Sequence, residues 1–129
     1  SARSSSGPGW CFLRSRDGRS ALYDAIAAGE WVSARLSGST FEQFVDDEVL
    51  CAAVERKLET MGDALSRAER AAPDLGEAVP VLRNVIGLRN VLAHGYDVVD
   101  AHVIYAIAVD DVPQLLALLR QMSSMEGLQ

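Results

Sequence analysis

The chain has 129 residues, 49% of them hydrophobic and 23% charged, which suits one domain with a substantial core. Eighteen acidic residues against twelve basic ones give a formal net charge of -6. This balance excludes a global positive field that would attract nucleic acid or an anionic membrane, so any anion site must be local.

No apolar run approaches the length of a membrane span, and no signal-peptide pattern is present. Cys11 and Cys51 lie far apart without metal-ligand spacing, which is typical of reduced thiols. A soluble, cytoplasmic protein is therefore expected.

The chain opens with SARSSSGPG, so we interpret residues 1–16 as a flexible arm or an expression scar, followed by one helical domain over 17–129. Apolar residues at helical spacing predict a first helix over 18–36, which SGST ends. Thr40 with Gln43 three residues later has the form of a capping box, which predicts a short helical turn there.

The clearest helical pattern follows DDE. Six apolar residues are spaced by four, four, three, four and three, which places all of them on one stripe: Leu50, Val54, Leu58, Met61, Leu65 and Ala68. The segment AAPDLGEAVP then breaks the pattern, and Pro80 suits the first turn of another helix.

The helix after Pro80 contains an anomaly. Its apolar face carries Leu82, Val85, Ile86 and Ala93. Arg89 lies in the middle of that face and must reach water, an anion or a partner surface, because an unpaired buried charge is too costly. Gly95 suits the left-handed position that ends many helices, so His94 is expected at the helix terminus, within reach of a cleft.

Two more helices are predicted beyond this point. Asp100 can cap a helix with Val103, Ile104 and Ile107, and DDVP restarts another with Leu115, Leu116, Leu119 and Met122. VIYAIAV could alone form a strand, but no second strand-like run exists to pair with it. The prediction is an all-α up-and-down bundle of about five helices.

The stretch RNVLAHGY, residues 89–96, combines residue types that suit phosphodiester cleavage. Histidine exchanges a proton near neutral pH, and the arginine fork matches two phosphate oxygens. In RNA the 2′-hydroxyl can attack its own phosphate with these two groups and no metal. No Gly-rich phosphate loop, metal-ligand set or cofactor motif competes, and His102 is interpreted as a solvated helix residue. The spacing of Arg89 and His94 also arises by chance, so it alone leaves a structural role open.

VIGLRNVLAHGY closely resembles the signature of the HEPN proteins, in particular the HepT toxin branch: Arg, four residues, His, one residue, Tyr. TFEQFVDDEVLCAAVERKLETMGDA resembles the second-helix segment of that family, and DVPQLLALL resembles its closing stretch. The likeness covers roughly residues 17–122. It implies a HEPN-like helical bundle.

The resemblance implies site residues one by one. Arg89 and His94 match the catalytic pair, Tyr96 the motif tyrosine, and Asn90 the polar residue after the arginine. Asp47 and Arg56 match polar positions on the second helix that would line the same cleft, with a surface or intersubunit salt bridge as the alternative. The sequence departs from the pattern at Asp63, where the family usually has Glu, and at Leu50, where a polar residue is common.

The resemblance also implies partners. Two subunits would pair so that both motifs face one cleft, giving a homodimer or higher oligomer. The substrate would be RNA, with tRNA the expected pool. A minimal nucleotidyltransferase of the MntA type would act as antitoxin by transferring AMP to Tyr96. The alternative is a non-catalytic helical module that binds a nucleotidyltransferase or nucleotides. The presence of both Arg89 and His94 favours the ribonuclease.

Overall fold

The computed structural model describes residues 16–94 and 99–125, and within these ranges every regular element is helical. The elements are α1 (Arg16–Leu36), α2 (Phe41–Asp46), α3 (Glu48–Ala71), α4 (Leu75–Ala78), α5 (Leu82–His94), α6 (Ala101–Ala106), η3 (Ile107–Asp111) and α7 (Val112–Met125). The all-α prediction is confirmed. The predicted arm lies outside the described residues except for Arg16, with which α1 begins. Three residues discussed above also lie outside them: Cys11, Gly95 and Tyr96.

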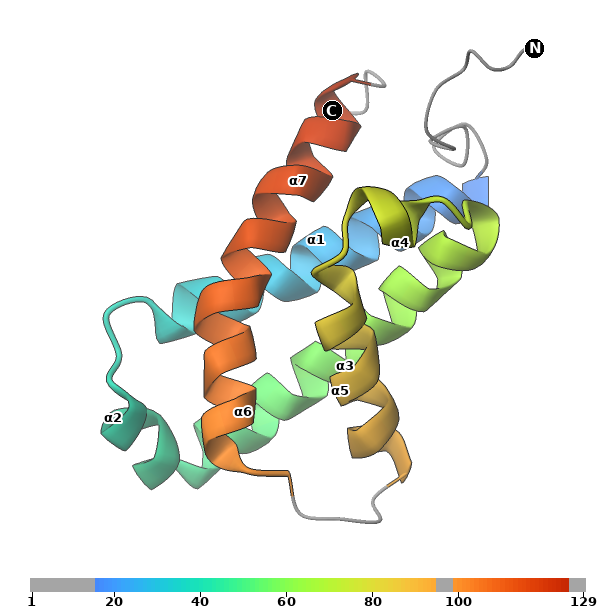
Figure 1. Ribbon diagram of the computed structural model, residues 1–129. Helices are drawn as coiled ribbons and strands as arrows, with labels where there is room; N and C mark the ends of the chain where they lie inside the picture. Colours follow the sequence, from blue (N-terminus) through green and yellow to red (C-terminus); the bar gives the residue numbers. More distant parts are fainter. Residues whose placement is uncertain (1–15, 95–98, 126–129) are drawn as a thin grey trace, which may run out of the picture.

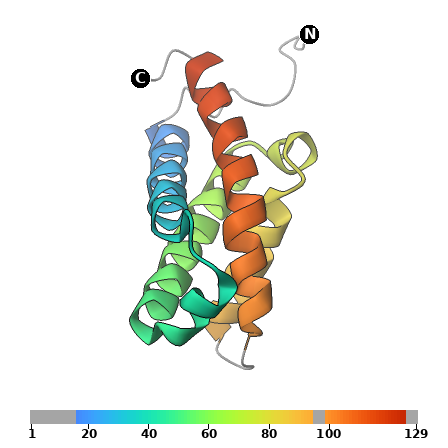
Figure 2. The same ribbon diagram turned by 90° about the vertical axis from the view of Figure 1, so that its left-hand side faces the viewer.

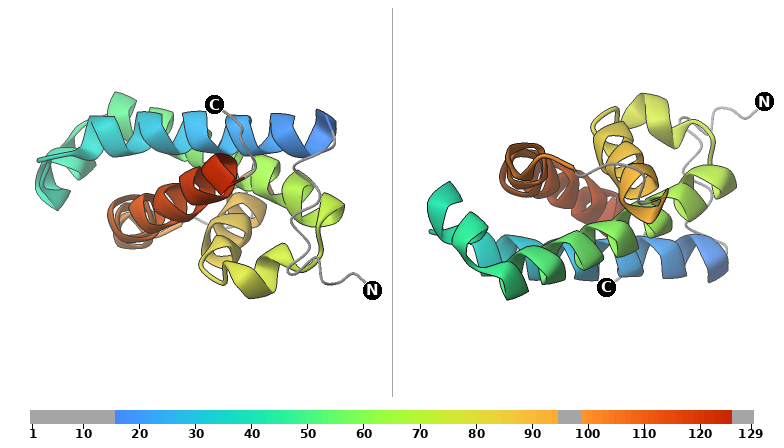
Figure 3. Two further views of the ribbon diagram at one scale, coloured as in Figure 1. Left: turned by 90° about the horizontal axis from the view of Figure 1, so that it is seen from above. Right: turned by 90° about the horizontal axis from the view of Figure 1, so that it is seen from below.

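The long helices form two layers. In Figure 1, α1 and α3 lie behind α5 and α7, and both views of Figure 3 show α1 beside α3 with the other long helices on one side of this pair. Helix α3 packs against both α1 and α5, and α7 packs on α1. The predicted stripe on α3 lies at the centre, since five of its six residues are buried: Val54, Leu58, Met61, Leu65 and Ala68.

Side-chain caps fix where three of the helices begin. The capping box predicted at Thr40 is present: its backbone N–H donates to Gln43 Oε1 over 2.9 Å, and the Gln43 N–H donates to Thr40 Oγ1 over 3.1 Å. Asp100 caps α6, as predicted, by accepting from the His102 backbone N–H. Asp47 caps α3 by accepting from the Leu50 N–H over 3.0 Å. Each cap satisfies a backbone donor that has no partner within the helix.

The two helices predicted after Asp100 join end to end. Figure 2 shows α6, η3 and α7 as one long helical segment, and the strand-like run VIYAIAV lies within it. The break expected at DDVP does not occur. Pro113 stands in the first turn of α7, after the wider turn of the π-helix η3, a position where its missing N–H is tolerated.

Residues 101–123 also qualify, by length and a mean hydropathy of 1.4, as a helix able to cross a membrane, contrary to the expectation that no such run exists. In the fold this segment contributes to the core through Ile104, Ala108, Val112, Leu115, Leu116, Leu119 and Met122. These contacts with the remaining helices are those of a core helix.

Helix α5 departs from its predicted description in two ways. It begins at Leu82 rather than in the turn with Pro80, whose carbonyl instead accepts from the Arg83 N–H over 3.1 Å. Ala93, expected on the buried face, is exposed and lines an open cleft between α3 and α5. Leu82, Val85 and Ile86 are buried as predicted.

Candidate active site

The candidate site forms where α5 crosses α3. Gly62 lies at the crossing, because a Cβ built there would come 2.4 Å from Arg89 Cβ and 3.0 Å from the Val85 carbonyl oxygen. No larger residue fits without moving a helix. The glycine thus lets the backbone of α5 lie close to α3 and brings the middle of α5 over the outer face of α3.

Arg89 reaches from this crossing into an open cleft. Its side chain is 35% exposed, Nη2 lies 3.6 Å from Asp63 Oδ1, and Nη1 donates to Asn90 Oδ1 over 3.2 Å. The guanidinium is therefore neither buried nor without partners, which resolves the anomaly of a cation on an apolar stripe. An exposed ion pair of this length is weak, about 0–1 kcal/mol, so an incoming phosphate can replace it.

The cleft around Arg89 has a volume of about 350 Å³ and is bounded by α3 and α5. Its lining residues are Arg56, Glu59, Thr60, Asp63, Arg67, Arg89 and Ala93. Arg56, predicted from the resemblance as a lining residue, lies here together with Arg89. Three arginines and two carboxylates, Glu59 and Asp63, line this small cleft, so its formal charge is about +1, a local positive excess in an acidic chain.

An ionic chain ties this cleft to α1. Arg67 lies 2.9 Å from Asp24 on α1 and 3.8 Å from Asp63, which in turn faces Arg89. Asp63 thus stands between two arginines on neighbouring helices. Its carboxylate limits the positions that the Arg89 side chain can adopt.

His94 is the last residue of α5 and is exposed. Its Nδ1 lies 2.5 Å from the backbone oxygen of Asn90, one turn earlier. A carbonyl oxygen only accepts, so Nδ1 carries a hydrogen, and in the neutral ring Nε2 is the nitrogen that takes up a proton. This contact fixes the tautomer that a general base needs.

The two motif side chains leave α5 in different directions. Residues five apart on an α-helix are separated by about 140° around its axis. Accordingly, Arg89 lines the cleft against α3, while His94 is not among the residues that line it. Asn90 connects the two, because its side chain accepts from Arg89 and its carbonyl accepts from His94.

The other predicted site residues are placed as follows. Asp47 caps the start of α3, nine residues before Arg56, and does not line the cleft. Tyr96 lies outside the described residues. His102 stacks on Phe41 with ring centroids 4.0 Å apart, and its Nδ1 lies 3.1 Å from Asp100, whose pKa is lowered chiefly by the His102 backbone N–H.

Reasoning from the sequence did not identify Asp63 and Arg67 as members of the site. Asp63 was noted only as a departure from the family pattern. Its neighbour Gly62 is the available signal, since a glycine inside a strong helical stripe often marks a close approach of another backbone. Among residues 16–94 and 99–125, no group of three His, Cys, Asp or Glu side chains is placed to hold a metal ion.

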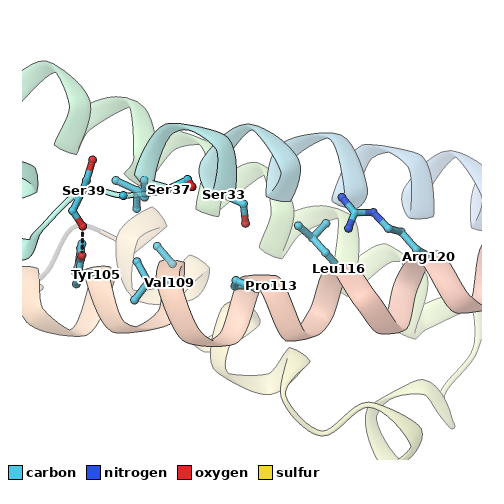
Figure 4. Close-up of a pocket in the computed structure, with 11 residues that line it drawn as sticks. Ser33, Ser37, Ser39, Tyr105, Val109, Pro113, Leu116 and Arg120 are labelled. Atoms are coloured by element: carbon cyan, nitrogen blue, oxygen red, sulfur yellow. Dashed lines mark hydrogen bonds between the residues drawn. The ribbon is translucent and has the colours of Figure 1, made fainter.

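A larger cleft, of about 540 Å³, lies on another side of the molecule, between the end of α1 and the α6–α7 segment (Figure 4). Tyr105 closes one end by donating its hydroxyl to the Ser39 carbonyl over 2.6 Å. Arg120, at the other end, is paired with Glu30 at 2.8 Å. No histidine lines this cleft. The smaller cleft beside α5 differs in that His94, a residue able to transfer a proton, lies on the same helix as Arg89.

Comparison with known proteins identifies the family. The model of the family described as "Ribonuclease HepT-like" matches residues 26–122. The protein named "Putative RNase TTE0752" of Caldanaerobacter subterraneus subsp. tengcongensis is 31% identical over 86 residues, which are 67% of this chain and 76% of the relative. "Putative RNase MJ1380" of Methanocaldococcus jannaschii is 28% identical over 105 residues, 80% and 94% of the two chains.

No solved structure matches the chain at a significant level. The family match covers most of the residues from α1 to α7, including the crossing of α3 and α5 and the whole of α5. The chain therefore belongs to the HepT-like family of ribonucleases.

Proposed function

We propose that the protein is a metal-independent endoribonuclease that acts as the toxin of a toxin–antitoxin pair in the cytoplasm, with tRNA as its substrate. The observation that carries this proposal is the linkage of Arg89 and His94 through Asn90 beside an open cleft. Arginine and histidine are the two groups that RNA cleavage by its own 2′-hydroxyl requires.

In the proposed reaction the 2′-oxygen attacks the adjacent phosphorus and the bond from phosphorus to the 5′-oxygen breaks. Nε2 of a neutral His94 removes the 2′-hydroxyl proton, and a protonated His94 supplies the proton that the departing 5′-oxygen needs. Arg89 leaves Asp63 and stabilises the charge on the phosphoryl oxygens. The products are a 2′,3′-cyclic phosphate and a 5′-hydroxyl.

The site is proposed to be completed by a second copy of the chain. Within one chain the cleft holds Arg89 but His94 does not line it, because the side chains diverge by about 140° around α5. A two-fold axis beside α5 would present each residue twice and bring a histidine of one copy near an arginine of the other.

Mixing two inactive variants tests the shared site. Arg89→Ala and His94→Ala homodimers each lack one group, whereas a mixed dimer keeps one arginine and one histidine around the same cleft. Unfolding and refolding the two together should restore part of the activity. A mixture as inactive as either variant alone, with mixed dimers demonstrated by mass spectrometry, would contradict a shared cleft.

The proposed antitoxin is a minimal nucleotidyltransferase that transfers AMP from ATP to Tyr96, with release of pyrophosphate. Tyr96 follows His94 by two residues, so an added AMP would bring a negative phosphodiester and an adenine beside the motif. It would compete with the RNA phosphate for Arg89 and silence cleavage.

Incubation of the purified protein with a total tRNA pool tests the activity. The His94→Ala and Arg89→Ala variants should each cleave about 10²–10⁴-fold more slowly while their circular dichroism is unchanged. The matched control is His102→Ala, which changes the only other histidine and should cleave as the unaltered chain does. Cleavage by both motif variants at the unaltered rate would overturn the assignment. Binding without cleavage by the unaltered protein would indicate the non-catalytic module.

A further inference from the structure

The described cations differ in whether a carboxylate neutralises them. Four arginines have a carboxylate oxygen within 4.0 Å: Arg67, Arg83, Arg89 and Arg120. Within the described part of the chain, no ion pair of this kind involves Arg35, Arg56 or Lys57. Arg70 also has none. Arg35 and Arg70 each lie in the last turn of their helix, where the helix dipole favours a cation, so Arg35 is distinguished by its place over the Trp31 ring.

Two of these cations, Arg35 and Lys57, lie beside one tryptophan ring. Arg35 Cζ is 5.0 Å from the centroid of the Trp31 ring, and Lys57 Nζ is 5.5 Å from the same centroid. Trp31 and Arg35 belong to α1, and Lys57 follows Arg56 on the neighbouring α3. We call Trp31, Arg35 and Lys57 the tryptophan cluster.

The tryptophan cluster and the active-site cleft share helix α3. Arg56 lines the cleft that holds Arg89, and the next residue, Lys57, belongs to the cluster. The five residues from Lys57 to Gly62, where α5 crosses, span about 7.5 Å along the helix. Five residues also turn the helix by about 140°, so the tryptophan cluster and the crossing lie on different sides of α3. A single strand that contacts both must cross the exposed face of α3 that carries Arg56.

Folding alone accounts poorly for this arrangement. Two like charges at one ring repel each other, and each single cation–π contact at a partly exposed ring contributes only about 0.5–1 kcal/mol. A bound polyanion would neutralise both cations, and the partly exposed indole offers a surface on which a base can stack. Surfaces that bind single-stranded nucleic acid commonly combine basic side chains with an aromatic ring.

We propose that the tryptophan cluster is a second contact surface for single-stranded RNA, which holds nucleotides flanking the phosphate bound by Arg89. This inference rests on the proposed ribonuclease function, and it adds a substrate class: an unpaired strand several nucleotides long, as in a loop. The cluster would contribute to affinity for the strand but not to the chemical step.

Charge removal at matched positions tests this surface. Binding is measured in the His94→Ala background, so that the RNA stays intact, with a single-stranded 12-nucleotide RNA as the probe. Arg35→Gln with Lys57→Gln removes two charges from the cluster; Arg83→Gln with Arg120→Gln removes two charges elsewhere and serves as the control.

The cluster variant should bind the 12-mer about tenfold more weakly than the control, as expected for two phosphate contacts of about 0.7 kcal/mol each. The slope of log Kd against log salt should fall by about 1.4, since each single-strand phosphate contact contributes about 0.7. Equal affinity and equal salt slope for the two double variants would overturn the proposal.

Fluorescence provides a second readout without altering the cluster. The chain has two tryptophans, so Trp10→Phe leaves Trp31 as the only one. RNA that stacks on or beside Trp31 should change its emission with the same Kd as binding. Binding with no change in emission would contradict contact at the cluster. An unaltered protein that neither binds nor cleaves RNA would overturn the proposed function as well. An unaltered protein that cleaves RNA, together with equal binding by the two double variants, would overturn only the proposed role of the tryptophan cluster.

Discussion

Gly62 of α3 lies directly under Arg89 of α5, so close that a Cβ on the glycine would come 2.4 Å from Arg89 Cβ. The arginine is thereby held at the closest point between the two helices, next to Asp63. A residue that has no side chain thus decides where the Arg89 side chain emerges from the fold.

Gly62→Ala should destabilise the protein by about 2 kcal/mol. Overpacking at a helix crossing lowers the free energy of unfolding by up to about 3 kcal/mol, and the higher helix propensity of alanine raises it by about 1 kcal/mol. Gly87→Ala is the matched control, since a Cβ there meets nothing within 4 Å and should stabilise α5 slightly. Urea unfolding of both variants measures the difference. A Gly62→Ala protein as stable as the Gly87→Ala protein would contradict the close crossing.

Asp63→Asn should lower kcat for RNA cleavage by about fivefold, which corresponds to the loss of about 1 kcal/mol of positioning. KM should not rise, because removing a carboxylate beside Arg89 also removes its repulsion of the RNA phosphate. Asp63→Glu, which restores the charge, should recover most of kcat. Equal kcat in all three proteins would show that Asp63 does not position the arginine.

The features that the sequence predicted correctly depend on neighbouring residues. Thr40 and Gln43 lie three residues apart, and the stripe on α3 follows the period of a single helix, so both are readable without knowing the fold. Asp47 has a role that the resemblance did not suggest, since its side chain caps α3. Its position before an apolar helical run would have indicated the cap.

The features that the sequence did not predict depend on contacts between helices. Asp63 and Arg89 are 26 positions apart and meet only because Gly62 allows α5 to approach. The break expected at Pro113 failed for a related reason. Packing of α7 on α1, and of η3 on α1 and α5, favours one continuous helix, and the π-helical turn accommodates the proline.

Excess chelator should leave RNA cleavage undiminished, because His94 and Arg89 supply proton transfer and charge stabilisation without a metal ion. The measurement is the initial rate in EDTA, compared with the rate after adding Mg²⁺, Mn²⁺ or Zn²⁺. Loss of activity that one of these ions restores would contradict the mechanism.

Tyr96→Phe should cleave RNA nearly as fast as the unaltered chain but resist silencing by the cognate nucleotidyltransferase with ATP and Mg²⁺. The phenylalanine retains the ring and lacks the hydroxyl to which AMP is proposed to be added. Intact-mass measurement should find one or more added AMP units on the tyrosine protein only. An equal mass increase on both proteins would place the modification elsewhere.

Cys51 should react slowly with iodoacetamide at pH 8. Burial, followed by the nearby carboxylates of Glu55, Asp47 and Glu48, raises the pKa of its thiol above the ordinary 9.0, and Sγ donates to the Phe44 carbonyl. Only the thiolate is alkylated, so the alkylation rate of Cys51 should rise with pH. It should still be rising at pH values where the alkylation rate of a free thiol has become constant. Peptide mapping measures the alkylation rate of Cys51, and N-acetylcysteine serves as the free-thiol reference. Alkylation of Cys51 at the free-thiol rate would contradict it.

The unneutralised cations beside Trp31 have a further consequence for a molecule whose net charge is -6. Most approach directions meet a repulsive potential, which salt screens beyond about 10 Å at 0.1 M. A polyanion diffusing toward the protein should therefore be repelled least near α3, where the cleft arginines and the tryptophan cluster lie, and should arrive there already oriented. The acidic surface thus disfavours RNA contacts away from the cleft. Neutralising carboxylates far from the cleft should increase the number of RNA–protein encounters, but more of these encounters should be unproductive.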